Sequence, residues 1–183
     1  MEKNAYKIVV TGPYAAGKST LVRSLCKDSL SIDSQGTTVV MDYGMRRYQE
    51  MDIALFGTPG QQRFNFMIEI IGKDADGIIL VIDSAYPETW PYAMTILKEV
   101  IRAGNTPCVV CANKQDLPNA QPSQVVMGTL GTENPVIETV ALTGKNVEVA
   151  LETLMKIIEE TGKKPSPITP PKFVSKIKKD VEN

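Results

Sequence analysis

Short apolar runs alternate along the chain with stretches in which apolar residues recur every three or four positions. The runs 77–82 and 107–112 are almost wholly apolar, which is typical of strands buried on both faces of a sheet. The stretches 87–103 and 146–160 place their apolar residues along one side of a helix. This alternation predicts an α/β domain with a mostly parallel sheet. Strands are expected at 6–10, 38–45, 51–56, 77–82, 107–112 and 136–140, and helices at 19–25, 64–71, 87–103, 123–128 and 146–160.

Two segments interrupt this alternation. Residues 27–36 are polar and are expected to form a loop before a hairpin of the strands 38–45 and 51–56. After Gly162, four prolines fall within seven residues, which predicts a stiff, extended linker. Behind it, apolar residues at 173, 177 and 181 fall on one face of a short lysine-rich helix. We therefore expect a first domain over residues 1–162 and a proline-rich linker with a basic tail over 163–183.

Length and charge agree with this division. A chain of 183 residues is long enough for one domain with its own core. The formal net charge is −1, which argues against a uniformly basic nucleic-acid binder. Residues 163–183 hold six lysines against two acidic residues, a net charge of +4, which leaves −5 for residues 1–162. No specific nucleic-acid partner is expected, whereas the basic tail could make a weak contact with a membrane or a partner.

The cysteines and the chain start indicate a reducing compartment. Cys108 and Cys111 form a C-x-x-C, but they lie in an apolar run without a second cysteine pair, and the chain has no histidine. Two reduced core thiols are therefore favoured over a zinc or redox site. The sequence has no signal-peptide layout and no apolar stretch of membrane-spanning length, so we expect a soluble, cytoplasmic protein.

Residues 12–19 carry the strongest chemical signal. They fit the pattern G-x-x-x-x-G-K-[ST] between a predicted strand and a predicted helix. The two glycines allow the backbone N–H groups to turn around a phosphate, and the helix adds its N-terminal dipole. Lys18 is placed to reach the β- and γ-phosphates, and the Ser19 hydroxyl is placed to ligate Mg²⁺. The residues expected to contact the nucleotide here are Gly12, Tyr14, Ala15, Ala16, Gly17, Lys18, Ser19 and Thr20.

A second motif selects the base. Asn113, Lys114, Gln115 and Asp116 follow a buried strand, at the sheet edge where α/β folds bind ligands. A carboxylate there accepts two hydrogen bonds from guanine, while adenine offers no matching pair of donors. With the phosphate loop upstream, guanine recognition is favoured. The alternatives are an ordinary polar turn and an ATP-dependent kinase or ATPase.

The order of the motifs resembles that of the Ras-like small GTPases. Thr38, the run Gly57-Thr58-Pro59-Gly60-Gln61 and the run 138–142 complete the set, and the resemblance covers about residues 5–161. The sequence around Thr38 and Gly57 is most similar to that of the prokaryotic branch, akin to bacterial and archaeal gliding-type small GTPases. The resemblance implies a three-layer P-loop NTPase fold with a six-stranded, mostly parallel sheet and about five helices. It also implies a switch between GDP and GTP that uses Mg²⁺.

The resemblance assigns roles around the γ-phosphate. Thr38 would meet Mg²⁺ with its hydroxyl and the γ-phosphate with its N–H, and the adjacent Thr37 is the alternative. The N–H of Gly60 would donate to the γ-phosphate, and Gln61 would orient the attacking water. Together with Lys18, Thr38 and Gln61 are the expected catalytic residues, and Thr38 joins Ser19 as a metal ligand.

The resemblance also assigns roles around the base. Asn113 and Asp116 would hold guanine, and Lys114 would lie along the base and brace the phosphate loop. The N–H of Ala141 would face the guanine oxygen, and Leu142 follows it in the same nucleotide-binding loop. This last motif is degenerate, because Leu142 stands where a lysine is common, and a plain turn is the alternative.

Two positions depart from the family pattern. Gly57 stands where an aspartate usually holds Mg²⁺ through water, which suggests weaker Mg²⁺ affinity or a substitute carboxylate such as Asp42 or Asp83. Tyr14 stands beside the γ-phosphate where a glycine is common. Its phenol could crowd an incoming arginine finger, so we expect slow hydrolysis without an activator. Arginines near the switch regions that could act in cis are Arg46, Arg47 and Arg63.

Two functions fit these residues. The first is a slow GTPase that switches a partner, with GTP ordering the segments 31–38 and 57–72. A GTPase activator, exchange factor or effector would bind near residues 38–47 and the helix at 64–71, where Phe64, Phe66 and Met67 could anchor it. The second is a GTP-binding scaffold or adaptor with negligible intrinsic hydrolysis. Gly57 and Tyr14 favour the scaffold, whereas Gln61 favours the enzyme.

Overall fold

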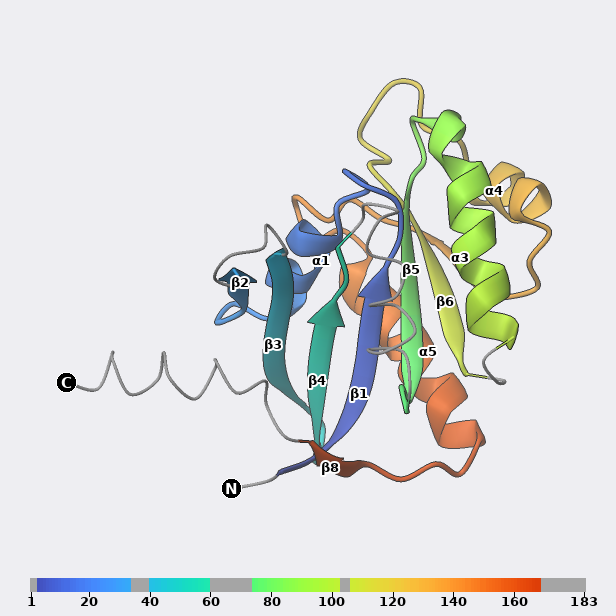
Figure 1. Ribbon diagram of the computed structural model, residues 1–183. Helices are drawn as coiled ribbons and strands as arrows, with labels where there is room; N and C mark the ends of the chain where they lie inside the picture. The colour runs from blue at the N-terminus through green and yellow to red at the C-terminus, as the bar shows by residue number, and fades with distance from the viewer. Residues whose placement is uncertain (1–2, 34–39, 60–73, 103–105, 169–183) are drawn as a thin grey trace.

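The computed structural model describes residues 3–33, 40–59, 74–102 and 106–168. Within these ranges, one eight-stranded sheet lies between helices on both faces (Figure 1). The strands are β1 (Lys3–Thr11), β2 (Leu30–Asp33), β3 (Val40–Tyr48), β4 (Met51–Gly57), β5 (Gly77–Asp83), β6 (Cys108–Asn113), β7 (Val136–Glu138) and β8 (Ser166–Ile168). The helices are α1 (Lys18–Leu25), α3 (Trp90–Arg102), α4 (Ser123–Leu130) and α5 (Val147–Glu160), with a 3-10 turn η2 (Pro87–Thr89).

The sheet has the expected mostly parallel core. Its order is β2-β3-β4-β1-β5-β6-β7, and β8 pairs with β1 outside this path. Strands β4, β1, β5, β6 and β7 run parallel, while β2 and β3 add antiparallel pairs at one edge. The predicted α/β class is confirmed. The helix expected at 64–71 lies outside the described residues.

The strand count differs from the six that the resemblance implies, because two short strands join the sheet. The loop expected at 27–36 is wrong in part, since β2 pairs with β3 from Leu30 opposite Tyr43 to Asp33 opposite Val40. The alternation of Leu30, Ser31, Ile32 and Asp33 suits an edge strand, but it is only four residues long.

The second added strand comes from the proline-rich segment. Ser166–Ile168 pairs antiparallel with the start of β1, from Lys3 opposite Ile168 to Ala5 opposite Ser166. This described part of the proline-rich segment therefore belongs to the sheet. Just before β8, the Lys163 ammonium forms a 2.9 Å ion pair with the Asp76 carboxylate, and the Tyr6 hydroxyl donates to the Lys163 carbonyl.

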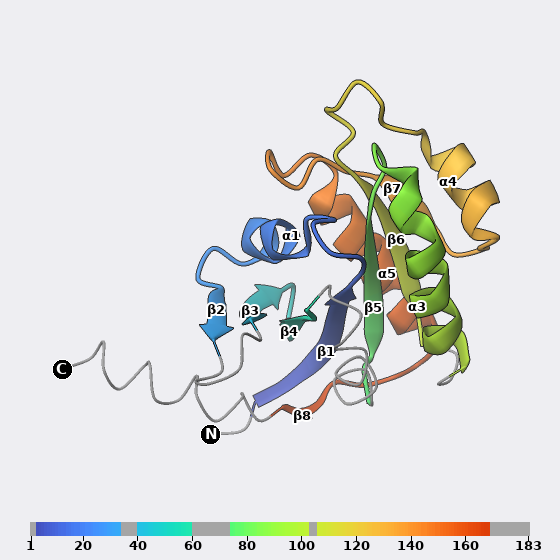
Figure 2. The ribbon, with the colours of Figure 1, turned by 45° about the horizontal axis from the view of Figure 1, so that its top comes forward.

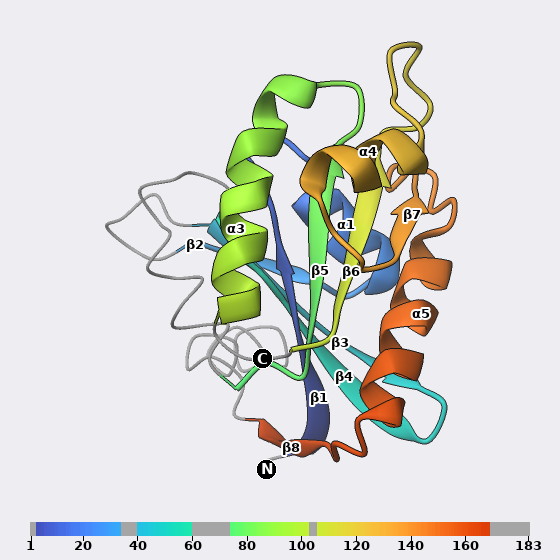
Figure 3. The same ribbon diagram turned by 90° about the vertical axis from the view of Figure 1, so that its right-hand side faces the viewer.

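The helices cover the sheet in two layers. Helices α1 and α5 pack on one face, and α3 and α4 pack on the other (Figure 3). The cysteines of β6 follow this division, because Cys111 packs with α1 and α5 while Cys108 packs with α3. Burial raises the pKa of both thiols to about 12, and thiols on opposite faces of a strand cannot share a metal ion. In the described residues, no helix is both long and apolar enough to cross a membrane.

The parallel strands gather their carboxyl ends at one pole. Val10 of β1 pairs with Gly57 of β4, and Asp83 of β5 pairs with Asn113 of β6. The loops that leave these strands therefore meet at the same end of the sheet, which faces the viewer more directly in Figure 2.

Candidate nucleotide-binding site

At two positions in the loop after β1, the backbone has a conformation that favours glycine. Gly12 has a φ of +143°, and a Cβ there would collide with the Val81 carbonyl oxygen. Gly17 has a φ of +101° and precedes α1, and a Cβ there would collide with the Asn113 amide. The two glycines thus hold the loop against β5 and β6. The loop ends at the N-terminus of α1, whose first turn contains no acidic residue.

Lys18 is the buried cation of this loop. Its side chain lies back across the loop, and the Nζ donates to the Pro13 carbonyl at 2.7 Å. Burial lowers the pKa of the ammonium to about 8, and the negative charge of Asp42 acts in the opposite direction. Ser19 and Thr20 follow in the first turn of α1 and are half-buried, while Tyr14 and Ala15 are exposed on the outside of the loop. An anion in the loop would favour the charged form of Lys18 and raise its pKa again.

The side chain of Asn113 joins this loop to the loop after β7. Its Nδ2 donates to the Ala16 carbonyl at 2.9 Å, and its Oδ1 accepts from the Ala141 N–H at 2.9 Å. The Thr139 hydroxyl donates to the same Oδ1 at 3.2 Å. Asn113 is 3% exposed, so three segments far apart in the sequence are held together by one buried amide.

A cavity of about 280 Å³ opens beside this amide. It is lined by Gly17, Thr20, Asn113, Lys114, Asp116, Leu117, Val140, Ala141 and Leu142. Leu117 and Leu142 are exposed apolar side chains on its walls, and the exposed carboxylate of Asp116 stands among them. Apolar walls with one carboxylate suit a flat heteroaromatic ring that carries N–H donors.

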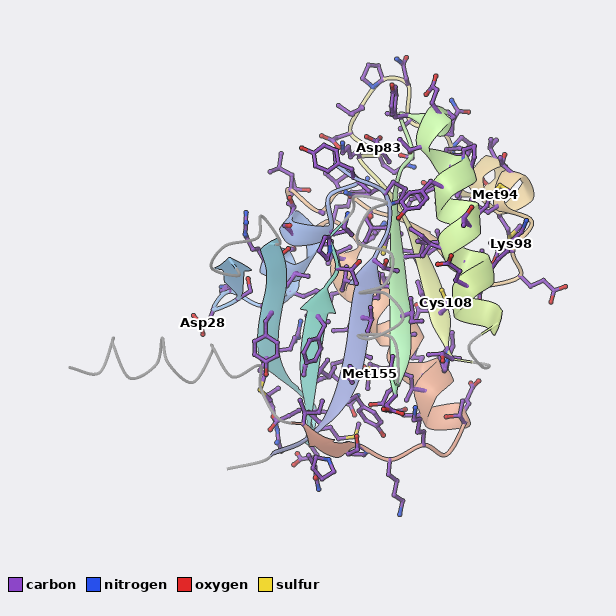
Figure 4. All side chains as sticks on the ribbon, viewed as in Figure 1. Asp28, Asp83, Met94, Lys98, Cys108 and Met155 are labelled. Carbon is purple, nitrogen blue, oxygen red and sulfur yellow. The ribbon has the colours of Figure 1, made fainter. Side chains whose placement is uncertain are left out.

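Lys114 is held in place from β5. Its ammonium bonds the Asp83 carboxylate at 2.6 Å, and the other Asp83 oxygen accepts from the Ala85 N–H. Figure 4 labels Asp83 at the upper end of β5, at the same pole as the phosphate loop. The backbone of Lys114 has a φ of +66°, which turns the chain sharply out of β6.

Comparison with known proteins agrees with this geometry. A family model described as "Ras family" matches residues 7–160. The chain belongs to the Ras family. The Ras-like P-loop GTPase resemblance is therefore confirmed, and the protein is a small GTP-binding protein of the GTPase class.

Relatives of this Ras-family protein occur in archaea and in eukaryotes. It is 31% identical over 125 residues to the uncharacterized protein MJ1339 of Methanocaldococcus jannaschii, across 68% of this chain and 80% of that protein. It is 32% identical over 155 residues to the Ras-related protein Rab-5B of Plasmodium falciparum, across 81% of this chain and 75% of that protein. Its fold is similar to the G domain of the FeoB iron transporter of T. maritima, with a TM-score of 0.66 and 23% identity, across 83% of this chain and 98% of that structure.

Two residues of this Ras-family protein that were expected at the base make contacts that the sequence did not predict. The Ala141 N–H donates to Asn113 Oδ1, and its expected contact with the guanine oxygen stays a prediction. The Lys114 ammonium pairs with Asp83, while the Asn113 amide bonds the phosphate loop, and the expected place of Lys114 along the base and against that loop stays a prediction. Both residues still line the cavity.

The expected γ-phosphate residues fall outside the described part of the chain. These are Thr38, its alternative Thr37, Gly60 and Gln61, and with them Arg63. The other two arginines considered as fingers have partners elsewhere. Arg46 forms a bidentate pair with Glu148 of α5 and donates to the Leu25 carbonyl, and Arg47 pairs with Asp52. These pairs hold both arginines to the protein's own surface.

Two contacts of the site were missed from the sequence. Thr139 donates to Asn113, and the Thr58 hydroxyl donates to the Thr11 hydroxyl at 2.9 Å, which ties the end of β4 to the start of the phosphate loop. Both threonines lie inside motifs that are visible in the sequence. A hydroxyl beside the end of a strand is the feature that could have indicated these hydrogen bonds.

Proposed function

We propose that this Ras-family protein binds GTP and GDP with Mg²⁺, hydrolyses GTP slowly and switches a partner protein between two states. The observation that carries the proposal is the buried Asn113 amide, which links a phosphate loop to a cavity containing the Asp116 carboxylate. One rigid unit can then recognise phosphates and base together.

Competition between nucleotides tests the binding step. Fluorescent GDP bound to the purified protein should be displaced by GTP and GDP but not by ATP at the same concentration. Displacement by ATP as effective as by GTP would contradict guanine recognition and favour the kinase or ATPase alternative. Tryptophan fluorescence supplies an independent signal, since the single tryptophan, Trp90, donates its indole N–H to the Asp83 carbonyl beside the site.

The chain's own residues have distinct tasks in this mechanism. The phosphate-loop N–H groups and Lys18 neutralise the phosphate charge, and the Ser19 hydroxyl is placed at the helix start to ligate a cation. Gln61 would orient the attacking water, and Thr38 would sense the γ-phosphate. Mg²⁺ would supply charge neutralisation across the phosphate oxygens when bound. Loss of the γ-phosphate would release the segments 31–38 and 57–72, and a partner would recognise the difference.

Slow hydrolysis is supported by the surface of the phosphate loop. The Tyr14 side chain is 68% exposed, where an activator would approach, and Arg46 and Arg47 have partners. We expect single-turnover hydrolysis by wild type on the order of 10⁻⁴–10⁻³ s⁻¹ without an activator. With extract of the source organism, Tyr14→Gly should be faster than wild type, while Tyr86→Gly, which removes another exposed tyrosine, should not differ from wild type. Fast unaided hydrolysis by wild type would overturn this part of the proposal.

A scaffold without turnover is the second candidate. It is favoured by Gly57, which brings no carboxylate to the end of β4, and by Tyr14. Phosphate release measured with and without extract separates the two, because a scaffold would release no phosphate in either condition.

Partners are expected on the switch segments. An effector, activator or exchange factor would bind the edge near residues 38–47, and Thr38→Ala should abolish capture that depends on a GTP analogue. Unchanged capture would reject the switch.

We further propose that the basic tail makes a weak contact with a membrane or partner, which sedimentation with anionic vesicles tests. A cytoplasmic site of action is supported by three free, buried cysteines.

A further inference from the structure

Asp42 and Gly57 face one another across the β3–β4 hairpin. They are register partners, and a Cβ built on Gly57 would lie 3.0 Å from the Asp42 Cβ and 3.3 Å from its Oδ2. Those distances are at the lower limit for such contacts between side chains. A side chain at position 57 would therefore crowd the side chain of Asp42, and one of the two would have to shift.

The same carboxyl group lies beside the phosphate loop. Gly57 pairs with Val10 of β1, and the next N–H, of Thr58, donates to the Val10 carbonyl at 2.9 Å. Asp42 is only 6% exposed. A buried carboxyl group on β3 thus lies at the end of β4, next to the strand that leads into the phosphate loop, although β4 itself ends in glycine.

Asp83 is the other carboxylate considered from the sequence, and it has a different task. One of its oxygens pairs with Lys114 at 2.6 Å, and the other accepts from the Ala85 N–H. Of these partners, Lys114 lines the cavity beside Asn113, so Asp83 is engaged with the base side of the site. Within the described ranges, no group of three or more histidine, cysteine or acidic side chains could hold a metal ion.

We propose that Asp42 takes over, from the neighbouring strand, the task of the carboxylate missing at position 57: it positions a Mg²⁺ ion bound with the nucleotide phosphates, through that ion's water ligands. The inference rests on the proposed function. Asp42 is a positioning residue, and the cation's direct protein ligand on the described residues is Ser19. Outer partners of this kind orient the first ligands and set metal affinity.

A reciprocal relation between the two positions follows from their contact. Because the side chains compete for one space, Gly57→Asp alone should crowd Asp42 and place two carboxylates together. The exchange Asp42→Gly with Gly57→Asp should return one carboxylate to the site from the other strand. A purely structural role for Asp42 predicts no such recovery.

The test measures how Mg²⁺ slows the release of fluorescent GDP. Free Mg²⁺ is raised stepwise from a solution with excess chelator, and the release rate is measured at each step. The readout is the free Mg²⁺ concentration at which the slowing of release is half-maximal. Asp42→Asn keeps the shape and removes the charge, and we expect it to raise this concentration by about 10–100-fold. The exchange variant should return it to within a few-fold of wild type. Asp52→Asn, at the far end of the same hairpin, is the matched control and should behave as wild type.

The outcomes separate cleanly. A wild-type midpoint in Asp42→Asn, or an equal shift in Asp52→Asn, would overturn the role of Asp42 while leaving guanine-nucleotide binding intact. If Asp42→Asn fails to fold by circular dichroism, the exchange variant decides, since folded protein that binds GDP without recovered Mg²⁺ dependence also overturns it. A wild type that does not bind fluorescent GDP would instead remove the proposed function itself.

Discussion

The buried amide of Asn113 permits a quantitative prediction. Asn113→Ala removes three hydrogen bonds and leaves the Ala16 carbonyl, the Ala141 N–H and the Thr139 hydroxyl without this partner. Each such bond contributes about 1 kcal/mol net, and leaving a buried group unsatisfied costs more. We therefore expect the free energy of unfolding without nucleotide to fall by at least about 3 kcal/mol. In a domain of this size that corresponds to a melting temperature lower by roughly 6–12 °C.

The same variant should respond less to nucleotide. GDP at about 100 times its dissociation constant stabilises a binding protein by about 2.7 kcal/mol. In Asn113→Ala the phosphate loop and the β7 loop are no longer joined, so the same GDP concentration should stabilise the variant less. The two effects are independent readouts of one side chain.

Urea unfolding followed by tryptophan fluorescence measures both effects. Trp90 is the only tryptophan and is 2% exposed, so its emission reports opening of the domain near the site. Asn119→Ala, an exposed asparagine six residues further along, is the matched control and should unfold as wild type does. An Asn113→Ala variant within about 0.5 kcal/mol of wild type would show that these bonds contribute nothing net, and the account of the site would be wrong.

Two further predictions concern charge. Asp116→Asn should weaken GDP binding about 100-fold, because losing one charge-assisted bond of the guanine pair costs about 3 kcal/mol, whereas Glu133→Gln on an exposed loop should bind normally in the same fluorescence titration. Unchanged affinity in Asp116→Asn would exclude that carboxylate from the base site. Because burial holds the pKa of Lys18 at about 8, below its unfolded value of 10.5, the folded protein loses this proton first. Without nucleotide, wild type should therefore gain stability relative to Lys18→Met between pH 8 and 10.5, by at most about 1.4 kcal/mol per pH unit in urea unfolding, and parallel pH profiles would contradict the shift.

The phosphate loop could be predicted because its constraints are local. The positions of Gly12, Gly17 and Lys18 are set by one turn between a strand and a helix, and a contiguous motif records them. The contacts of the Ala141 N–H and of Lys114 depend on how β5, β6 and the β7 loop pack together. No pattern within either segment specifies those partners, so these contacts could not be predicted from the sequence.

The place of Asp42 opposite Gly57 depends on the register of two strands, which the sequence alone does not show. Tyr48 and Met51 pair across a two-residue turn, and the same number of residues away from the turn on each strand leads to Asp42 and Gly57. The sequence contains every residue of this pairing, but the pairing is visible only once the turn at Gln49, whose φ is +51°, is known. Strand β8 was missed for a different reason, because Pro167 lacks the N–H that strand patterns assume.

Strand β1 connects two opposite ends of the molecule. Its carboxyl end leads into the phosphate loop, and its amino end pairs with β8. The two ends are roughly 30 Å apart, because β1 has nine residues that each rise about 3.3 Å. Strand β8 therefore lies at the pole of the sheet opposite the phosphate loop (Figure 1). If the protein were attached to a sensor chip, a bead or a cell surface next to β8, the pole with the phosphate loop would point toward solution. A second protein could then reach that pole.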